Sequence, residues 1–316
     1  MKTVVPNTYP LFRCIADRCR HTCCAGWEID VDETTLSKYK SLPTDIGSRI
    51  LSSIDFSDGE AHFRLLKDDK CPFLTGNGLC DLMLLTKDDS LLSDICRDHP
   101  RYRYIFSDRE ETGLGLCCEE ACRISLGETT GFSLIELDTD GKDELPDFFE
   151  EEFFAERKSI FKLIGNRSLP IHERVSSLEK NFSAALPVKA DRNLLSLFLS
   201  LEHLHPMWPE MLNSLDPIPK ASDLSMPGHL QIPMEQLLYH LLFRHLSPSV
   251  DDDLFRERTG LCILIWRLAA ALVKAHISRT GSCAFEELIE YVRLISSEIE
   301  YSDHNIDLML DAFFER

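Results

Sequence analysis

Apolar residues in the second half of the chain recur every three or four positions, the spacing of one face of an α-helix. The clearest stripe, typical of an amphipathic helix, consists of Met234, Leu237, Leu238, Leu241 and Leu242. A second helix is predicted over 148–164, with Gly165-Asn166 as its C-terminal stop. The segment 256–274 is apolar nearly all round, so we expect it to form a central buried helix.

Breaks in this pattern predict how the chain is divided. Proline-rich stretches at 204–209 and 217–227 separate the helices, and alternating β patterns are few. A polar run, 138–144, lies between Gly127 and Pro146 and is typical of a linker. We therefore predict a mainly α protein, in which a cysteine-rich metal-binding N-terminal region (1–126) is packed with a helical C-terminal region (145–316).

Composition narrows the class of partner. The 316 residues are 44% hydrophobic and 28% charged, enough for a substantial core, and the formal net charge is −19. Such an acidic chain is unsuited to nucleic acid or to anionic membrane surfaces, which bind through cationic side chains. The first twelve residues lack a secretory signal, and the apolar run 261–273 is interrupted by Arg267 and too short for a bilayer. We expect a cytoplasmic protein with no nucleic-acid or membrane partner.

The cysteines are concentrated at one end of the chain. Ten of the twelve lie within the first 122 residues, whereas Cys262 and Cys283 fall inside apolar helical patterns and are expected to be small buried residues. A reducing cytosol does not favour structural disulfides. A set of thiolates that holds a soft metal is the simplest explanation for the concentration.

The cysteines form four groups that must converge to complete one site. Those groups are Cys14 with Cys19, Cys23 and Cys24; Cys71 with Cys80; Cys96; and Cys117 with Cys118 and Cys122. The turn Gly76-Asn77-Gly78 can bring Cys71 and Cys80 together, because Gly and Asn accept positive φ. The tandem C-x2-C pairs of zinc fingers and the C-x3-C-x2-C spacing are both absent from the sequence. The spacing therefore does not decide between an iron–sulfur site and a zinc site.

The sequence carries none of the common motifs for nucleotide binding, metalloprotease or serine-hydrolase chemistry. The sequence has no phosphate-binding G-x-x-x-x-G-K-[ST], no H-E-x-x-H and no G-x-S-x-G. Gly113-Leu114-Gly115 is too short for a dinucleotide fingerprint.

Several of these segments resemble the flagellin lysine-N-methylase family. They are Phe12–Asp17 with Cys19, Cys23-Cys24 and Gly26-Trp27; Cys71–Leu74 and Gly78–Cys80; Cys96 with Pro100-Arg101; Cys118 with Glu120-Ala121 and Arg123; and, more weakly, Arg167–Leu169 with Glu173-Arg174. The resemblance implies methyl transfer from S-adenosylmethionine to lysine ε-amines of flagellin, with a [4Fe–4S] cluster.

The resemblance also supplies a set of metal ligands. The matched cysteines are Cys14, Cys19, Cys23, Cys24, Cys71, Cys80, Cys96 and Cys118. Eight thiolates exceed the four that one cubane cluster needs, so there are either two metal sites or some structural cysteines. Adjacent Cys23 and Cys24 are expected to point in different directions, and Cys117 and Cys122 to be packed thiols.

Methyl transfer to lysine requires the neutral amine, whereas an ordinary lysine with a pKa of ~10.4 is protonated. Tyr39 and His99 are candidate catalytic residues that would help to deprotonate it. Arg97 and Arg101 are candidates to bind the carboxylate of S-adenosylmethionine. Asp32 is expected to cap a helix over 34–40.

Two other functions remain open. The chain could be a non-catalytic zinc- or iron-binding interaction protein, or a thiol redox sensor or iron-handling protein. The sequence does not indicate an oligomeric state.

Overall fold

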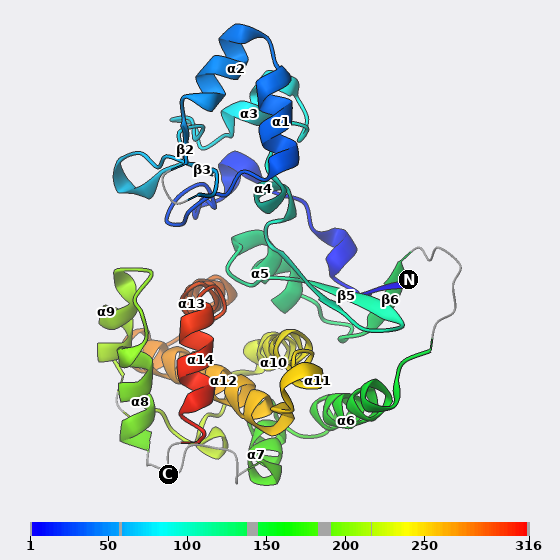
Figure 1. Ribbon diagram of the computed structural model, residues 1–316. Coiled ribbons are helices and arrows are strands. Elements are labelled where there is room, and N and C mark those ends of the chain that lie inside the picture. The colour runs from blue at the N-terminus through cyan, green and yellow to red at the C-terminus, as the bar shows by residue number, and fades with distance from the viewer. Residues whose placement is uncertain (1, 57–58, 138–144, 183–190, 216, 315–316) are drawn as a thin grey trace. The chain divides into compact units, whose positions relative to one another are not determined.

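The computed structural model describes residues 2–56, 59–137, 145–182, 191–215 and 217–314, so the expected linker at 138–144 lies outside the described residues. The chain forms two compact units. The cysteine-rich unit is Arg13–Pro100, and the helical unit comprises Met1–Phe12 and Arg101–Arg316. The protein is mainly helical, as predicted (Figure 1).

The units do not follow the boundary expected at residue 126. Residues 101–126 belong to the helical unit. One reason is strand pairing, because β1 (Lys2–Pro6) pairs in parallel with β5 (Arg109–Leu114). The other is helix packing, because α5 (Glu119–Leu126) packs on α10 and α13. The cysteine-rich unit is thus an insertion between two parts of the helical unit.

A sheet that the sequence pattern did not predict starts the helical unit. Its order is β4 (Arg101–Ile105), β5, β1 and β6 (Leu134–Leu137), with antiparallel β4–β5 and β1–β6 pairs. Tyr102 lies opposite Gly113, where a Cβ would stand 2.2 Å from the tyrosine ring. Glycine is therefore required at this position in β5.

Helices make up the rest of the helical unit. They are α6 (Phe148–Ile164), α7 (Ile171–Asn181), α8 (Asp191–Ser200), α9 (Met207–Asn213), α10 (Gln231–Leu246), α11 (Ser249–Asp252), α12 (Phe255–Thr280), α13 (Phe285–Ile299) and α14 (Asp303–Asp311). The two helices predicted from apolar periodicity are confirmed as α6 and α10, and the helix predicted from an almost uniformly apolar segment is confirmed as α12. Gly165 is the C-cap of α6, so the predicted stop is also confirmed.

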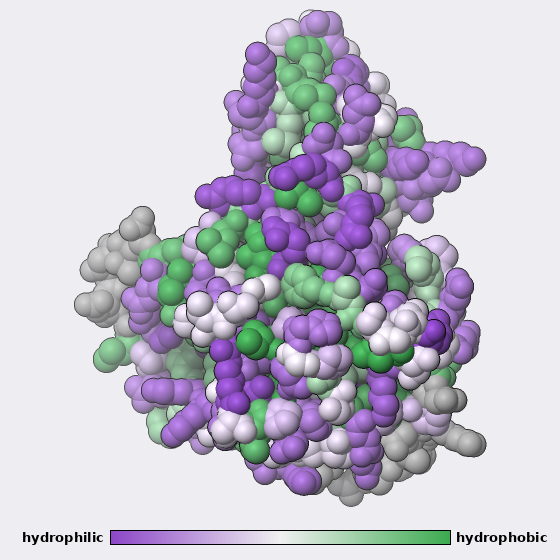
Figure 2. Space-filling model, turned by 180° about the vertical axis from the view of Figure 1, so that it is seen from behind, coloured by the Kyte–Doolittle hydropathy of each residue, from purple (hydrophilic) through white to green (hydrophobic). Residues whose placement is uncertain are grey.

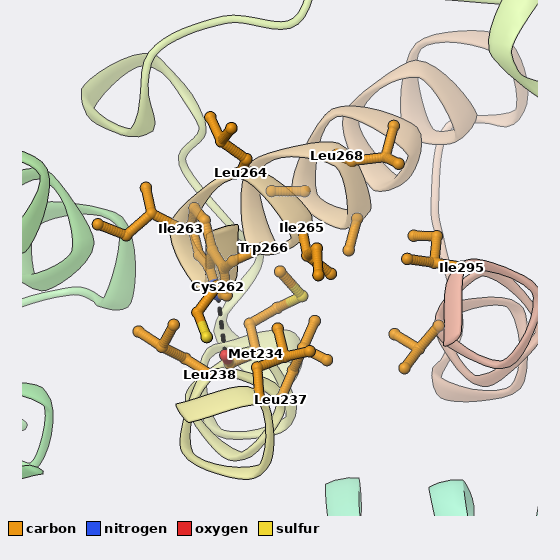
Figure 3. Close-up of a cluster of buried hydrophobic side chains, with 14 of the residues drawn as sticks. Met234, Leu237, Leu238, Cys262, Ile263, Leu264, Ile265, Trp266, Leu268 and Ile295 are labelled. Atoms are coloured by element: carbon orange, nitrogen blue, oxygen red, sulfur yellow. Dashed lines mark hydrogen bonds between the residues drawn. The ribbon is translucent and has the colours of Figure 1, made fainter. Parts of the chain in front are cut away.

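The core of the helical unit is centred on α12. Figure 3 shows side chains of α12 meeting Met234 and Leu237 of α10 and Ile295 of α13. The indole Nε1 of Trp266 donates to the carbonyl of Met234 at 2.9 Å, so the one polar atom of this large side chain is satisfied.

Helix α12 is longer than the apolar run seen in the sequence and, by length and composition, is long enough to cross a membrane. Its most apolar window is 78% buried inside the protein. Buried Arg267 donates to the carbonyls of Ile218 and Pro219 and forms an ion pair with Glu179 at 3.0 Å. The apolar surface of α12 is therefore covered within the helical unit, and the charge of Arg267 has its partners there.

The cysteine-rich unit consists of short elements. They are α1 (Glu33–Ser41), α2 (Thr44–Leu51), β2 (Ile54–Asp55), β3 (His62–Phe63), α3 (Asp81–Thr86) and α4 (Asp94–Asp98). Figure 2 shows hydrophobic side chains on the surface of the part that carries α1 to α3. Three consecutive residues of α3 contribute exposed apolar side chains: Met83, Leu84 and Leu85.

Candidate metal centre

Four cysteine side chains share the core of the cysteine-rich unit. Cys71 is buried, and the other three are partly buried against the same apolar cluster: Cys24, Cys80 and Cys96. Burial raises the pKa of Cys71, Cys80 and Cys96, and the negative charge of neighbouring thiolates in this set raises it further. Three of the four predicted cysteine groups therefore contribute to one place.

Cys24 and Cys71 are brought together by backbone pairing. The amide of Cys71 donates to the carbonyl of Cys24 at 2.8 Å, and the amide of Gly26 donates to the carbonyl of Asp69 at 3.0 Å. Ala25 and Lys70 form the antiparallel bridge between these two bonds. Two segments that lie about 45 residues apart in sequence thus place their cysteines side by side.

The segment from Cys71 to Cys80 folds back on itself as predicted. Thr75 and Leu79 close the turn, with the Thr75 amide donating to the Leu79 carbonyl at 2.9 Å. Gly78 has φ +75°, a conformation that glycine adopts without steric cost. An antiparallel bridge joins Leu74 and Cys80, so the turn returns the chain toward Cys71.

Cys96 is positioned by helix α4, which Asp32 ties to α1. One carboxylate oxygen of Asp32 accepts the Thr35 amide at 2.8 Å and caps α1, which confirms the predicted cap. The other oxygen accepts the amide of Asp94 at 3.0 Å, at the start of α4. A single capping residue therefore also fixes the helix that carries Cys96.

The surroundings of the thiols disfavour their charged form. Burial raises the pKa of Cys71 to about 12 and that of Cys96 to about 11. Cys24 differs, because a hydrogen bond from the Cys23 thiol lowers its pKa to about 7. Thiolates in such a core need a compensating positive charge, which a bound metal ion supplies.

The donor set suits a metal in number and type, since four cysteines are the ligands of a [4Fe–4S] cluster and of a structural zinc ion. Within the described residues, however, no group of three or more His, Cys, Asp or Glu side chains is placed to hold a metal ion. The four thiols share a core without standing at ligand distances.

The loop before Cys24 carries three further predicted ligands. Cys14 is exposed and accepts the Ala16 amide at 3.4 Å, and the Cys19 thiol donates to the His21 carbonyl at 3.0 Å. Cys23 is exposed whereas Cys24 packs against the core, as expected for adjacent side chains. These three cysteines lie outside the apolar cluster that contains Cys24.

The fourth cysteine group belongs to the helical unit. Cys118 is the N-cap of α5 and packs against a small cluster that contains Phe12 and Leu114. Cys122 is fully buried in the main core, so the packed-thiol prediction is confirmed for it. The prediction that Cys262 and Cys283 are small buried residues is also confirmed.

Tyr39 and His99, the candidate catalytic residues, both lie in the cysteine-rich unit. Tyr39 is fully buried, and its hydroxyl donates to the carbonyl of Leu91 at 2.6 Å. Burial raises the pKa of this phenol, and the neighbouring thiols Cys96, Cys80 and Cys71 raise it further. His99 is the C-cap of α4, and its ring lies 5.9 Å from that of Trp27.

Arg97 and Arg101 lie in different units. Arg97 forms an ion pair with Asp94 at 2.7 Å and donates to the carbonyl of Leu92 at 2.7 Å. Arg101, at the start of β4, donates to the hydroxyl of Tyr9 at 3.0 Å and lies 5.4 Å from the ring of Phe12. Each guanidinium is thus engaged within its own unit.

Two aromatic residues near the thiols were not among the predicted site residues. Phe63 and Phe73 are buried in the same cluster as Cys71, with ring centroids 5.0 Å apart and an angle of 67° between the ring planes. The sequence carried one signal for them: Phe73 lies two residues after Cys71 in the turn segment. Phe63 is brought in by strand β3, which the sequence pattern did not predict.

Comparisons with known proteins give partial similarity. The chain is 28% identical over 132 residues to the lysine-N-methylases of Salmonella choleraesuis (strain SC-B67) and Salmonella typhimurium (strain LT2). This match covers 40% of the chain and 32% of each relative, so it spans about a third of the length of those proteins. The flagellar biosynthetic protein FliU of Salmonella muenchen is 28% identical over 137 residues, which are 39% of the chain and 80% of FliU.

No protein-family profile matches the chain, and no solved structure matches it. The similarity is thus confined to part of the chain and to about a third of the length of the lysine-N-methylases.

Proposed function

We propose that this protein is a lysine-N-methylase that transfers methyl groups from S-adenosylmethionine to lysine ε-amines of flagellin and carries a [4Fe–4S] cluster in its cysteine-rich unit. The observation that carries the proposal is the gathering of four thiols in one apolar core. Partial similarity to lysine-N-methylases and to a flagellar protein supports the reaction and the substrate.

The proposed ligands are Cys24, Cys71, Cys80 and Cys96. When bound there, a cluster would supply an electron-transferring, Lewis-acidic centre. Phe63 and Phe73 lie in the same apolar cluster as these thiols and would help to keep water away from them. Exclusion of water and of nearby hydrogen bonds is one means by which a protein sets the reduction potential of such a centre.

The remaining predicted ligands receive other roles in this proposal. Cys14, Cys19 and Cys23 lie on the loop that leads into Cys24, and the Cys23 thiol donates a hydrogen bond to Cys24. We assign Cys23 to support of that ligand. Cys118 packs in the helical unit, so it is left out of the four-ligand set.

The substrate lysine has to lose its proton before it can attack a methyl group. Water-excluded apolar surroundings lower the pKa of an amine because burial disfavours its charged form. We propose that the site favours the neutral amine mainly by this route, and that the lysine releases its proton to bulk solvent as it is buried. The Tyr39 hydroxyl is not assigned this role, because it already donates to Leu91.

The proposal includes a cytoplasmic location. A reducing compartment keeps thiols available to bind a metal, and the number of cysteines in this chain favours such a compartment.

The test is anaerobic purification and reconstitution, followed by iron and sulfide analysis and a methyl-transfer assay with labelled S-adenosylmethionine and purified flagellin. We expect about four iron and four sulfide per chain, together with label in flagellin lysines. Iron-loaded protein that incorporates no label would overturn the reaction. Label transferred by protein free of iron would overturn the role of the cluster.

Matched cysteine variants sharpen this test. Cys71→Ser and Cys96→Ser should each lose the iron and most of the activity. Cys14→Ser removes an exposed thiol from the same unit and should keep both. Equal iron loss in all three variants would contradict the four-ligand assignment.

A non-catalytic zinc-binding protein is the second candidate, because four cysteines are also a complete ligand set for structural zinc. About one zinc per chain, with no iron after anaerobic purification, would favour it.

A further inference from the structure

An open pocket of about 480 Å³ lies between α6 and α7 of the helical unit, which are neighbours in Figure 1. Its volume is within the range of small-molecule sites. The lining residues are Ser159, Lys162, Leu163, Asn166, Leu169, Arg174 and Ser177. Neither the metal proposal nor the methyl transfer uses any of them.

The lining follows from helix periodicity. Ser159, Lys162 and Leu163 occupy one face of α6, and Asn166 follows just beyond the end of that helix with the same spacing. Arg174 and Ser177, three residues apart, share a face of α7. Two polar helix faces therefore line the same pocket, with Leu163 and Leu169 as its apolar part.

Arg174 gives this pocket a buried cation. The side chain is 3% exposed, and its Nη1 donates to the carbonyl of Ile164 and to Glu235 at 2.6 Å. Its Nε has no hydrogen-bond partner among the described residues. A buried N–H without a partner is uncommon in native proteins, and a bound ligand or water would supply an acceptor.

The local charge is positive although the whole chain is acidic. Glu235 is shared by Arg167 and Arg174, so its single negative charge meets two guanidiniums. Lys162 adds another positive charge and has no ion pair within the part of the chain that the structure describes. Glu173, on the first turn of α7, is exposed and does not line the pocket.

We propose that this pocket binds a small organic anion, a phosphate ester or a carboxylate. The anionic group lies between Lys162 and Arg174, and the apolar part of the ligand packs on Leu163 and Leu169. The hydroxyl of Ser159 adds a hydrogen bond to the anion, whereas that of Ser177 donates to the carbonyl of Glu173 at 2.9 Å. S-adenosylmethionine fits poorly, because the lining contains no carboxylate for its ammonium and sulfonium groups.

The probe is phenyl phosphate, titrated into the full-length protein by calorimetry, with inorganic phosphate and phenol as separate arms. We expect saturable binding of one phenyl phosphate per chain, weaker binding of inorganic phosphate, and none of phenol. Lys162→Gln should weaken phenyl phosphate binding about tenfold, the effect of losing one charge-assisted hydrogen bond. Filling the pocket with Ser177→Leu should abolish it.

Lys158→Gln is the matched control, because it removes an exposed lysine of the same helix that does not line the pocket. It should change the affinity by less than about twofold. Equal weakening by Lys158→Gln and Lys162→Gln would mean non-specific attraction and would overturn the site. Absence of saturable binding to the unmodified protein, or full binding by the Ser177→Leu variant, would also overturn it.

Discussion

The two units of this protein differ in how their cores are built. The helical unit is organised around the long buried helix α12, and its large apolar cluster also includes α10 and α13. The cysteine-rich unit has short helices, two-residue strands, and a small cluster that includes Cys71 as one of its buried members. Small cores rarely supply enough stability alone.

The comparison indicates what each unit depends on. Packing of apolar side chains accounts for the stability of the helical unit. In the cysteine-rich unit, thiols occupy part of the small apolar core. A metal bound to those thiols would contribute folding free energy directly. The predictions below test this difference, from the largest expected effect to the smallest.

Removal of metal should have the largest effect, and it should affect the two units differently. Chelation of the reconstituted protein should unfold the cysteine-rich unit, because the ligand thiols lose the cation that offsets their burial. Limited proteolysis should then cut within residues 13–100 and leave fragments of the helical unit intact. Equal protection of both units after chelation would contradict a metal-dependent core.

The helical unit should be sensitive to the loss of one of its buried ion pairs, Arg157 with Glu111. Both Nη atoms of Arg157 donate to Glu111 at 2.6 Å, and both side chains are buried. Glu111→Gln would leave the guanidinium without its counter-charge, so it should lower the free energy of unfolding by about 3–5 kcal/mol. Glu110→Gln, which affects a partly exposed pair with Arg103, should cost less than about 1 kcal/mol. Denaturant titration of the two variants distinguishes them.

Glu298 should make the stability of the helical unit depend on pH. Burial raises its pKa from 4.5 to about 7, although its carboxylate accepts the Leu204 amide at 2.9 Å. The native state therefore keeps this proton to a higher pH than the unfolded chain does. It follows that the free energy of unfolding falls as the pH rises from about 4.5 to about 7.

Glu298→Gln should remove that pH dependence. At pH 8 its free energy of unfolding should be about 2 kcal/mol higher than that of the unmodified protein. The amide oxygen of glutamine can still accept from Leu204. Glu210→Gln, at an exposed position of α9, serves as the control and should leave the pH profile unchanged. Parallel profiles for unmodified protein and Glu298→Gln between pH 5 and pH 8 would refute the assignment.

Tyr39→Phe should give the smallest effect and should report on the cysteine-rich unit. Loss of the hydrogen bond to Leu91 should lower its stability by about 1 kcal/mol. Methyl transfer should be largely retained, because the hydroxyl is buried and engaged. A large fall in methyl transfer with unchanged stability would instead make Tyr39 a catalytic residue.

The sequence by itself determined the local elements. Apolar periodicity placed α6 and α10, because a helix that packs on a core needs one apolar face, and an almost uniformly apolar segment placed α12, because such a helix is buried on all sides. Gly165 ended α6, Asp32 began α1, and Gly78 turned the chain between Cys71 and Cys80. Each of these signals depends on neighbours within a few residues.

Only the tertiary structure decided which distant segments meet. Strand β1 pairs with β5 across more than 100 residues, so residues 101–126 belong to the helical unit and Cys118 with them. Of the eight cysteines proposed as ligands, the structure brings Cys24, Cys71, Cys80 and Cys96 into one core. Spacing along the chain does not encode that selection, because it depends on which backbone segments pair and which side chains face the core that they create.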